Sequence, residues 1–120
     1  MSGFFFPRAL RLRSKADFDR VYGRRKSVAD DVLIVYGREN DAGHPRLGLS
    51  VSRKVGGAVQ RNLWKRRIRA AFRESQHELP RAVDLVVSPR RRSDASYEAI
   101  RASLCDLARR VERKLEARRS

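Results

Sequence analysis

Residues 42–73 constrain what this chain can fold into more than any other part of its sequence. Within them, Trp64, Ile68 and Phe72 recur at every fourth position, which is the spacing of one buried face of an α-helix. A Gly-Gly pair precedes this pattern and a proline follows it, as is typical of helix boundaries. We therefore predict a helix over residues 58–77 whose apolar stripe packs against the rest of the domain.

The same segment is strongly basic and contains no acidic residue. It holds nine Lys and Arg, whereas the whole 120-residue chain has 29 of them against 14 Asp and Glu, a net charge of +15. At about 100° per residue, Lys65, Arg66, Arg69 and Arg73 fall with Asn62 on one side of the apolar stripe. Crowded like charges repel each other, and a solvated helix face normally mixes both signs. The pattern predicts a polyanion-binding surface, with nucleic acid favoured over an anionic membrane or a general effect on solubility.

Composition narrows the class of protein further. Arginine outnumbers lysine 24 to 5, which favours RNA because the planar guanidinium pairs with phosphate and stacks on bases. A compositional bias of the source genome would produce the same ratio. The single cysteine excludes an internal disulfide, and no apolar run approaches the ~20 residues of a membrane helix. We expect a small, basic, intracellular domain.

The rest of the sequence predicts an α+β fold. Ser14 is a suitable N-cap for a helix that ends near residue 24. Apolar and alternating runs predict strands at 32–36, 46–52 and 83–88, and a last amphipathic helix starts near residues 93–96. The expected order is α-β-β-α-β-α, with a small, mostly antiparallel sheet packed against the helices. The loop over 37–45 suits an antiparallel hairpin. We predict one RNA-binding domain over 1–120, with 1–13 as an N-terminal extension and 14–116 as the folded body.

No sequence pattern indicates a nuclease site borne by the protein. General acid–base cleavage of RNA needs two proton-transfer groups near one phosphate, and nothing in the sequence brings His44 and His77 together. Metal-assisted cleavage needs clustered carboxylates, and the adjacent pair Asp30 and Asp31 fits a turn before a strand better. Cys105 lies among leucines of the last helix and fits a small buried residue. We expect neither catalytic nor metal-ligating residues in the chain.

The string from Arg46 to Phe72, RLGLSVSRKVGGAVQRNLWKRRIRAAF, resembles the protein subunit of bacterial ribonuclease P. That family has a strand ending in Gly-Leu-Ser-Val-Ser-Lys-Lys, a Gly-Asn-Ala-Val turn and a helix of Arg-Asn-Arg-x-x-Lys-Arg-x-x-Arg character. The N-terminal Phe-Pro pair and the His-Glu-Leu-Pro stretch before the third strand also fit, so the resemblance covers about residues 6–115. Two departures are Leu63, where the third residue of the Arg-Asn-Arg triplet is expected, and Gly57, where Asn is usual.

The resemblance implies a β-α-β crossover that carries the basic helix, and a division of labour between protein and RNA. The RNA subunit would hold Mg²⁺ and remove the 5′ leader of precursor tRNA, whereas the isolated protein would be inactive. The resemblance assigns to the catalytic RNA Arg53, Lys54, Arg61, Asn62, Lys65, Arg66, Arg69 and Arg73. It assigns the aromatic residues Phe18, Tyr22 and Tyr36 to the single-stranded leader, in a cleft between the first helix and the sheet. Independently of the resemblance, a cleft role requires flanking cations, and we expect Arg11 and Arg46 to supply them. The implied place is the cytoplasm, with no membrane and no obligate protein partner.

Several alternatives stay open from the residues alone. Aromatic side chains at the spacing of Phe18 and Tyr22 occur more often in a core than in a cleft. A ribosomal or other structural RNA-binding protein without a processing role would carry a similar basic helix. A metal-dependent nuclease that acts alone and a DNA-binding module are the remaining classes.

Overall fold

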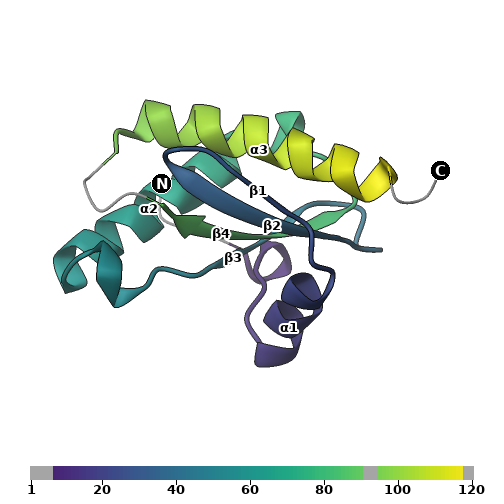
Figure 1. Ribbon diagram of the computed structural model, residues 1–120, viewed down its shortest axis with the longest axis horizontal. Helices are drawn as coiled ribbons and strands as arrows, with labels where there is room; N and C mark the ends of the chain where they lie inside the picture. Colours follow the sequence, from purple (N-terminus) through teal and green to yellow (C-terminus); the bar gives the residue numbers. More distant parts are fainter. Residues whose placement is uncertain (1–6, 91–94, 118–120) are drawn as a thin grey trace.

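The computed structural model describes residues 7–90 and 95–117, which form a four-stranded sheet with helices on both of its faces (Figure 1). The elements in chain order are α1 (Lys15–Gly23), β1 (Ser27–Ala29), β2 (Leu33–Glu39), β3 (Arg46–Leu49), α2 (Ala58–Glu74), β4 (Val83–Pro89) and α3 (Tyr97–Ala117), with 3-10 turns at Arg8–Leu10, Arg53–Val55 and Gln76–Glu78. The predicted α+β class is confirmed, and the short strand β1 is an addition to the predicted elements. The predicted start of the last helix at 93–96 lies partly outside the described residues.

The predicted antiparallel hairpin between residues 32–36 and 46–52 is wrong. The strand order is β1-β2-β4-β3, so β4 lies between β2 and β3, antiparallel to the first and parallel to the second. Strand β4 takes the central place because it is apolar on both faces, with Leu85 buried on one side and Val86 on the other. The connection from β3 to β4 is the expected β-α-β crossover, and it carries α2.

The larger of two apolar cores fills the space between the sheet, α2 and α3 (Figure 1). Trp64, Ile68 and Phe72 are fully buried in it, as their spacing predicts. Helix α3 approaches β2 so closely that a Cβ at Gly37 would lie 3.0 Å from two methyl groups of Val111. The burial of Trp64, Ile68 and Phe72 fixes the rotation of α2 about its axis. It therefore also fixes which face of α2 turns to solvent.

The smaller core lies between α1 and the opposite face of the sheet. It is built on Leu12, Val21 and Val86. The backbone N–H of Leu12 donates to the carbonyl of Leu47 at 2.9 Å, so part of the segment expected as an N-terminal extension runs along β3. Because α1 spans only nine residues, it covers part of this face, and Tyr36 stays half-buried beside it.

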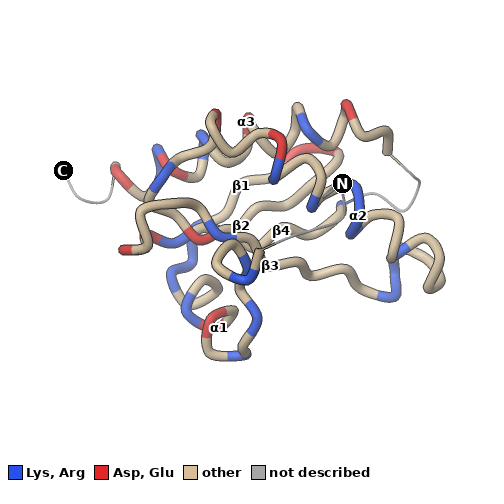
Figure 2. Tube along the Cα trace, turned by 180° about the vertical axis from the view of Figure 1, so that it is seen from behind, with Lys and Arg blue, Asp and Glu red and all other residues tan. Residues whose placement is uncertain are grey.

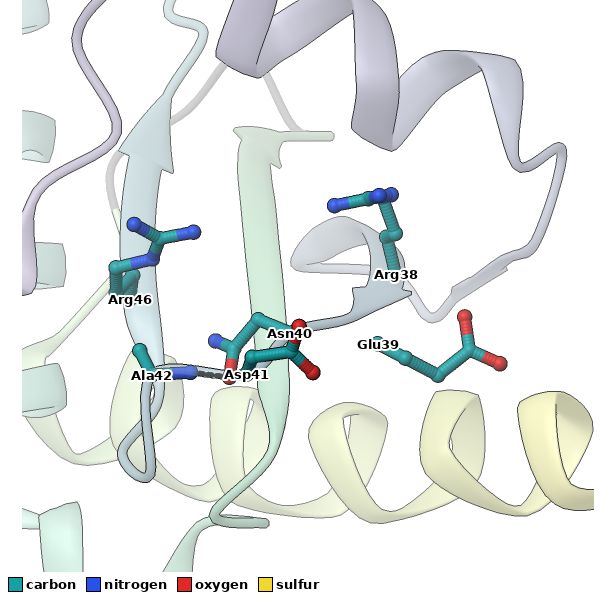
Figure 3. A pocket seen from close by; sticks show the side chains of 6 residues that line it. All are labelled: Arg38, Glu39, Asn40, Asp41, Ala42 and Arg46. Atoms are coloured by element: carbon teal, nitrogen blue, oxygen red, sulfur yellow. Dashed lines mark hydrogen bonds between the residues drawn. The ribbon is translucent and has the colours of Figure 1, made fainter.

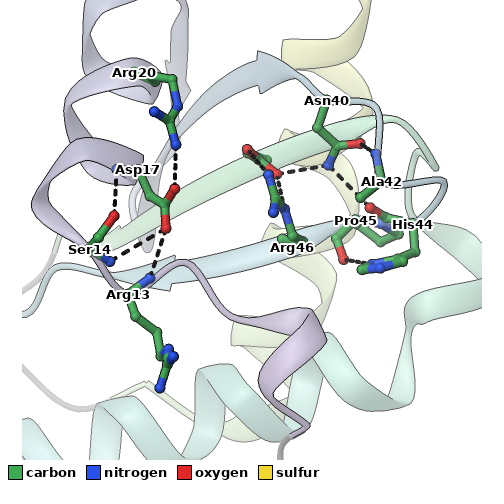
Figure 4. Close-up of polar contacts among 10 residues, drawn as sticks. Arg13, Ser14, Asp17, Arg20, Asn40, Ala42, His44, Pro45 and Arg46 are labelled. Atoms are coloured by element: carbon green, nitrogen blue, oxygen red, sulfur yellow. Dashed lines mark hydrogen bonds and ion pairs between the residues drawn. The ribbon is translucent and has the colours of Figure 1, made fainter.

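Short polar contacts fix the helix ends and turns. Ser14 is the N-cap of α1 in a capping box with Asp17, whose backbone N–H donates to the Ser14 hydroxyl at 3.0 Å (Figure 4). Asp30 accepts hydrogen bonds from the backbone of Val32 and Leu33 at 2.8 and 3.0 Å, which is the turn role expected for it. No helix within the described ranges is both long and apolar enough to cross a membrane.

Candidate nucleic-acid interface

The solvent side of α2 carries the predicted cations. Asn62, Arg66 and Arg69 are exposed, and Lys65 is half-buried beside the apolar stripe. Glu74, at the C-terminal end, is the only acidic residue of this 17-residue helix. Basic residues recur along α2, whereas basic and acidic residues are mixed along α3 (Figure 2). The predicted alignment of Asn62, Lys65, Arg66 and Arg69 on one side of the helix is therefore present in the structure.

The N-terminal end of α2 adds positive potential to this face. The helix begins after Gly57, which has no side chain to cap the first N–H groups, and no acidic residue lies in the first turn. Arg53 and Lys54 are exposed in the 3-10 turn just before it. The unbonded N–H groups of a helix start favour anions, so this end of α2 reinforces the charge of the side chains.

Three arginines of α2 have more constrained surroundings. Arg61 lies at the border of the stripe, and its Nε is buried without a hydrogen-bond partner among the described residues. Arg73 contacts Glu74, with 3.7 Å between Nη2 and Oε2. Arg67 donates to the carbonyl of Ala95 at 2.6 Å, which ties it to the segment before α3. Arg67 is therefore engaged in a contact within the protein.

A groove of about 320 Å³ joins α1, β3 and α2, and we call it the α1 groove. Its lining brings Arg11 and Phe18, expected to bind the leader, next to Lys65 and Arg69, expected to bind the catalytic RNA; the other lining residues are Leu12, Arg13, Leu47 and Leu49. None of these described lining residues is acidic. Two members of each predicted set therefore meet in one place, which the sequence did not indicate.

The walls of the α1 groove carry positive charge. Desolvation of the guanidinium inside the groove lowers the pKa of Arg69, and the positive charge of Arg11 lowers it further. Arg69 therefore lies in a positive local field, although its side chain reaches solvent. Such a field attracts anions, so the groove is suited to a phosphate.

The three predicted aromatic residues form a row along this side of the sheet. The ring centroids of Phe18 and Tyr22 are 6.4 Å apart, and those of Tyr22 and Tyr36 are 5.0 Å apart in an edge-to-face arrangement. Phe18 and Tyr36 pack on the smaller core and stay half-buried, whereas Tyr22 is 38% exposed. A Cβ at Gly48 would lie 2.8 Å from the ring of Phe18, so glycine is needed there for the ring to rest on β3. The rings combine a packed side with an accessible one.

Arg46 is held by a buried carboxylate. Its Nε and Nη2 donate to Asp84 at 2.8 and 2.9 Å, and Asn40 donates to the same carboxylate at 2.7 Å (Figure 4). The hydrogen bond to Asp84 raises the pKa of Arg46. Its side chain is still 30% exposed, and the guanidinium keeps an outer edge that can meet a ligand.

Arg46 also lines a second groove, of about 460 Å³, with Arg38 on the other side (Figure 3). Sequence reasoning missed Arg38. It lies two residues after Tyr36 on β2 and so shares a strand face with it, and this alternation is the signal that could have found it. Glu39, which also lines this groove, is bound by two hydrogen bonds of 3.0 Å from Arg24.

The residues considered for nuclease chemistry are spread over the fold. His44 contacts the carbonyl of Pro45 at 3.1 Å in the loop after β2 (Figure 4), and His77 is exposed after α2. Cys105 is buried on α3, 3.8 Å from a carboxylate oxygen of Glu78. No group of three or more His, Cys, Asp or Glu within residues 7–90 and 95–117 could hold a metal ion. The interface is suited to binding by charge and stacking.

Comparison with known proteins gives consistent results over almost the whole chain. The family model described as Ribonuclease P matches residues 6–112. The chain is 35% identical over 112 residues to the ribonuclease P protein component of Thermotoga maritima, covering 89% of this chain and 96% of that protein. It is 40% identical over 106 residues to the component of Salmonella arizonae, covering 88% and 89%.

Solved structures agree with the sequence relatives. The structure of the T. maritima RNase P protein matches with a TM-score of 0.76 and 33% identity, covering 83% of this chain and 96% of that one. A Staphylococcus aureus RNase P protein mutant with defective mRNA degradation activity matches with a TM-score of 0.76 and 36% identity, covering 87% and 89%.

Proposed function

This chain belongs to the ribonuclease P protein family, and from this premise we propose which parts of its surface bind which RNA. As a subunit of that endoribonuclease it acts in tRNA processing, with the ribonuclease P RNA as its partner. The solvent face of α2 binds the RNA subunit, and the α1 groove with the aromatic row binds the single-stranded 5′ leader of precursor tRNA. The observation that carries this proposal is the meeting of Arg11, Phe18, Lys65 and Arg69 in one groove, with no carboxylate among its described lining residues.

The two binding roles follow from position on α2. Asn62 and Arg66 point to solvent, away from the buried stripe, where a folded RNA can dock against a rigid helix. Lys65 and Arg69 lie next to the stripe and turn toward α1. A leader strand in the groove would therefore pass between the protein and the docked RNA subunit, with its phosphates near Arg11, Lys65 and Arg69.

The aromatic row gives this groove a means of holding unpaired bases. Each base stacked on an aromatic ring contributes about 1–3 kcal/mol, and stacking tolerates any sequence. Phe18 and Tyr36 are fixed by the smaller core, so little side-chain freedom is lost when a base stacks on their exposed sides. This mode of binding does not depend on the base sequence of the leader.

The chemical step belongs to the RNA subunit in this proposal. Mg²⁺ would be held by that RNA and the substrate, and it would stabilise the charge that develops as water attacks the phosphodiester bond. The protein neutralises nearby phosphates and positions the leader, which raises the affinity of the assembly for substrate and metal. The isolated chain is then inactive, and its place of action is the cytoplasm.

A cleavage assay at near-physiological salt and Mg²⁺ tests the proposed function. Precursor tRNA is incubated with the ribonuclease P RNA alone, with the protein alone and with both. We expect efficient release of the leader only with both. Equal cleavage by the RNA with and without the protein would contradict the proposal, and cleavage by the RNA-free protein would favour a nuclease that acts alone.

A further inference from the structure

A further basic groove lies at the edge of the sheet farthest from β3. It has a volume of about 670 Å³ and runs between strand β1 and the C-terminal half of α3, and we call it the β1–α3 groove. Strand β1 forms one edge of the sheet and β3 the other, so this groove and the α1 groove are on opposite edges. The function proposed above makes no use of it.

Three cations line the β1–α3 groove, and none of its described lining residues is acidic. Arg113 and Lys114 are exposed on consecutive positions of α3, and Arg110 lies one turn before them. Arg110 also contacts Asp106, with 3.3 Å between Nη1 and Oδ2, so part of its charge is balanced. The remaining charge favours an anionic ligand.

The register of β1 determines which backbone groups face outward. The N–H of Gly37 donates to the carbonyl of Lys26, and the N–H of Asp30 donates to the carbonyl of Leu33, each at 3.1 Å. Hydrogen-bonded and non-bonded pairs alternate along antiparallel strands. The positions between these bonded pairs, Ser27 and Ala29, therefore direct their backbone groups away from β2.

One of these outward groups is already used. The ammonium group of Lys114 donates to the carbonyl of Ser27 at 2.9 Å. An added β-strand needs alternating donors and acceptors, and it would find this acceptor occupied on an edge of only three residues. The outward N–H groups of Ser27 and Ala29 remain as donors, and they suit a ligand whose atoms only accept hydrogen bonds.

We propose that the β1–α3 groove binds the sugar-phosphate backbone of RNA, as a contact surface separate from α2 and the α1 groove. Phosphate oxygens accept hydrogen bonds and carry the charge that Arg110, Arg113 and Lys114 attract. No aromatic residue is among the described lining residues, so the groove has no platform for base stacking and reads no sequence. With basic surfaces at two opposite edges, one protein bridges two RNA segments.

A matched pair of variants tests this proposal. Arg113 lines the groove, whereas Arg109 lies on the other flank of α3, 3.9 Å from Glu78. Binding of the ribonuclease P RNA is measured by fluorescence anisotropy at several salt concentrations. We expect Arg113→Ala to weaken binding about three- to tenfold and to lower the magnitude of the salt slope by about 1. Arg109→Ala should change binding much less, because it removes the same charge outside the groove.

Three other results of these binding measurements would contradict the proposal. Equal losses in Arg113→Ala and Arg109→Ala would show a general charge effect and overturn the proposal. Loss of RNA binding in Arg66→Ala without loss in Arg113→Ala would overturn it while leaving the function proposed for the solvent face of α2 intact. A polyglutamate peptide is the control ligand, and loss of peptide binding with unchanged RNA binding in Arg113→Ala would assign the groove to an acidic protein partner instead.

A positional measurement completes the test. An iron chelate is attached to Arg113→Cys or to Arg109→Cys, each in a Cys105→Ala background, and hydroxyl radicals are generated in the complex with the RNA. We expect discrete cuts in the RNA backbone from position 113 that position 109 does not give. The absence of cuts from position 113 would overturn the proposal.

Discussion

Arg46 of β3 and Asp84 of β4 face each other across the parallel strand pair and are joined by two hydrogen bonds of 2.8 and 2.9 Å. Asp84 is only 3% exposed, and Asn40 donates a third hydrogen bond to it. A carboxylate can be buried here because these donors replace its lost hydration. The pair ties the ends of three strand segments together and fixes the direction of the Arg46 guanidinium.

Asp84→Asn should destabilise the fold. Removing the negative charge leaves Arg46 half-buried without its ionic partner, and breaking such a pair costs about 2–4 kcal/mol in the free energy of unfolding. Urea unfolding followed by the fluorescence of Trp64, the only tryptophan, measures this cost. Glu39→Gln is the control, since its pair with Arg24 is more exposed and should contribute less than about 1 kcal/mol. Equal losses in the two variants would contradict the special role of the Arg46 pair.

Gly48→Ala should separate leader binding from binding of mature tRNA. The new Cβ would lie 2.8 Å from the Phe18 ring and 3.2 Å from Cβ of Leu12, so the ring must move. We expect about tenfold weaker binding of leader-bearing tRNA by the assembled enzyme and a stability loss of about 1–3 kcal/mol from overpacking. Gly23→Ala is the control, because a Cβ there meets no atom within 4 Å. Equal losses on mature and leader-bearing tRNA would show that Phe18 acts only as a core residue.

The sequence predicted well where local spacing determines the structure. The stripe of Trp64, Ile68 and Phe72 fixed both the existence of α2 and the side that faces solvent, because a helix has one regular period. Ser14 was predictable as a cap for the same local reason, since its hydroxyl bonds within its own first turn.

Strand pairing and groove composition were not predictable in this way. The hairpin expected for the loop over 37–45 is absent because β4, far along the chain, is buried on both faces and inserts between the two strands. The approach of Arg11 to Arg69 likewise depends on a segment that runs along β3 and meets α2 only in three dimensions. Packing brings together residues that are far apart in the sequence. Such contacts leave no regular spacing of residue types from which a single sequence could predict them.

Ser103→Ala should change the acid side of the stability profile. Burial alone would raise the pKa of Asp30, but hydrogen bonds from Leu33, Ser103 and Val32 outweigh it and hold the pKa below its usual value. As the pH falls, the Asp30 carboxylate of the unfolded chain binds a proton before that of the folded chain does. The contribution of the Asp30 hydrogen bonds to the free energy of unfolding is therefore present above about pH 4 and is lost at lower pH. Urea midpoints measured from pH 7 to pH 2 should fall less steeply below pH 4 in Ser103→Ala than in the wild type. An unchanged slope would contradict the role of this hydrogen bond.

Arg69→Ala should weaken the binding of leader-bearing precursor tRNA, whatever the base sequence of the leader. Arg69 lies in the α1 groove beside Arg11, where it would neutralise a phosphate without reading a base. We expect the magnitude of the salt slope of binding to fall by about 1. Arg81→Ala removes the same charge from an exposed position between α2 and β4 and serves as the control. Equal changes in both slopes would mean that only the net charge matters.

Leu63→Arg should tighten binding of the RNA subunit. Leu63 is half-buried on α2, next to the exposed Asn62 and one position outside the apolar stripe. Arginine has a favourable helix propensity, and its long stem can occupy a half-buried position while the guanidinium reaches solvent. We expect about three- to tenfold higher affinity and a salt slope steeper by about 1. Leu63→Met, which keeps the apolar character without adding charge, should leave the affinity unchanged. An unchanged affinity in Leu63→Arg as well would mean that position 63 makes no contact with the RNA.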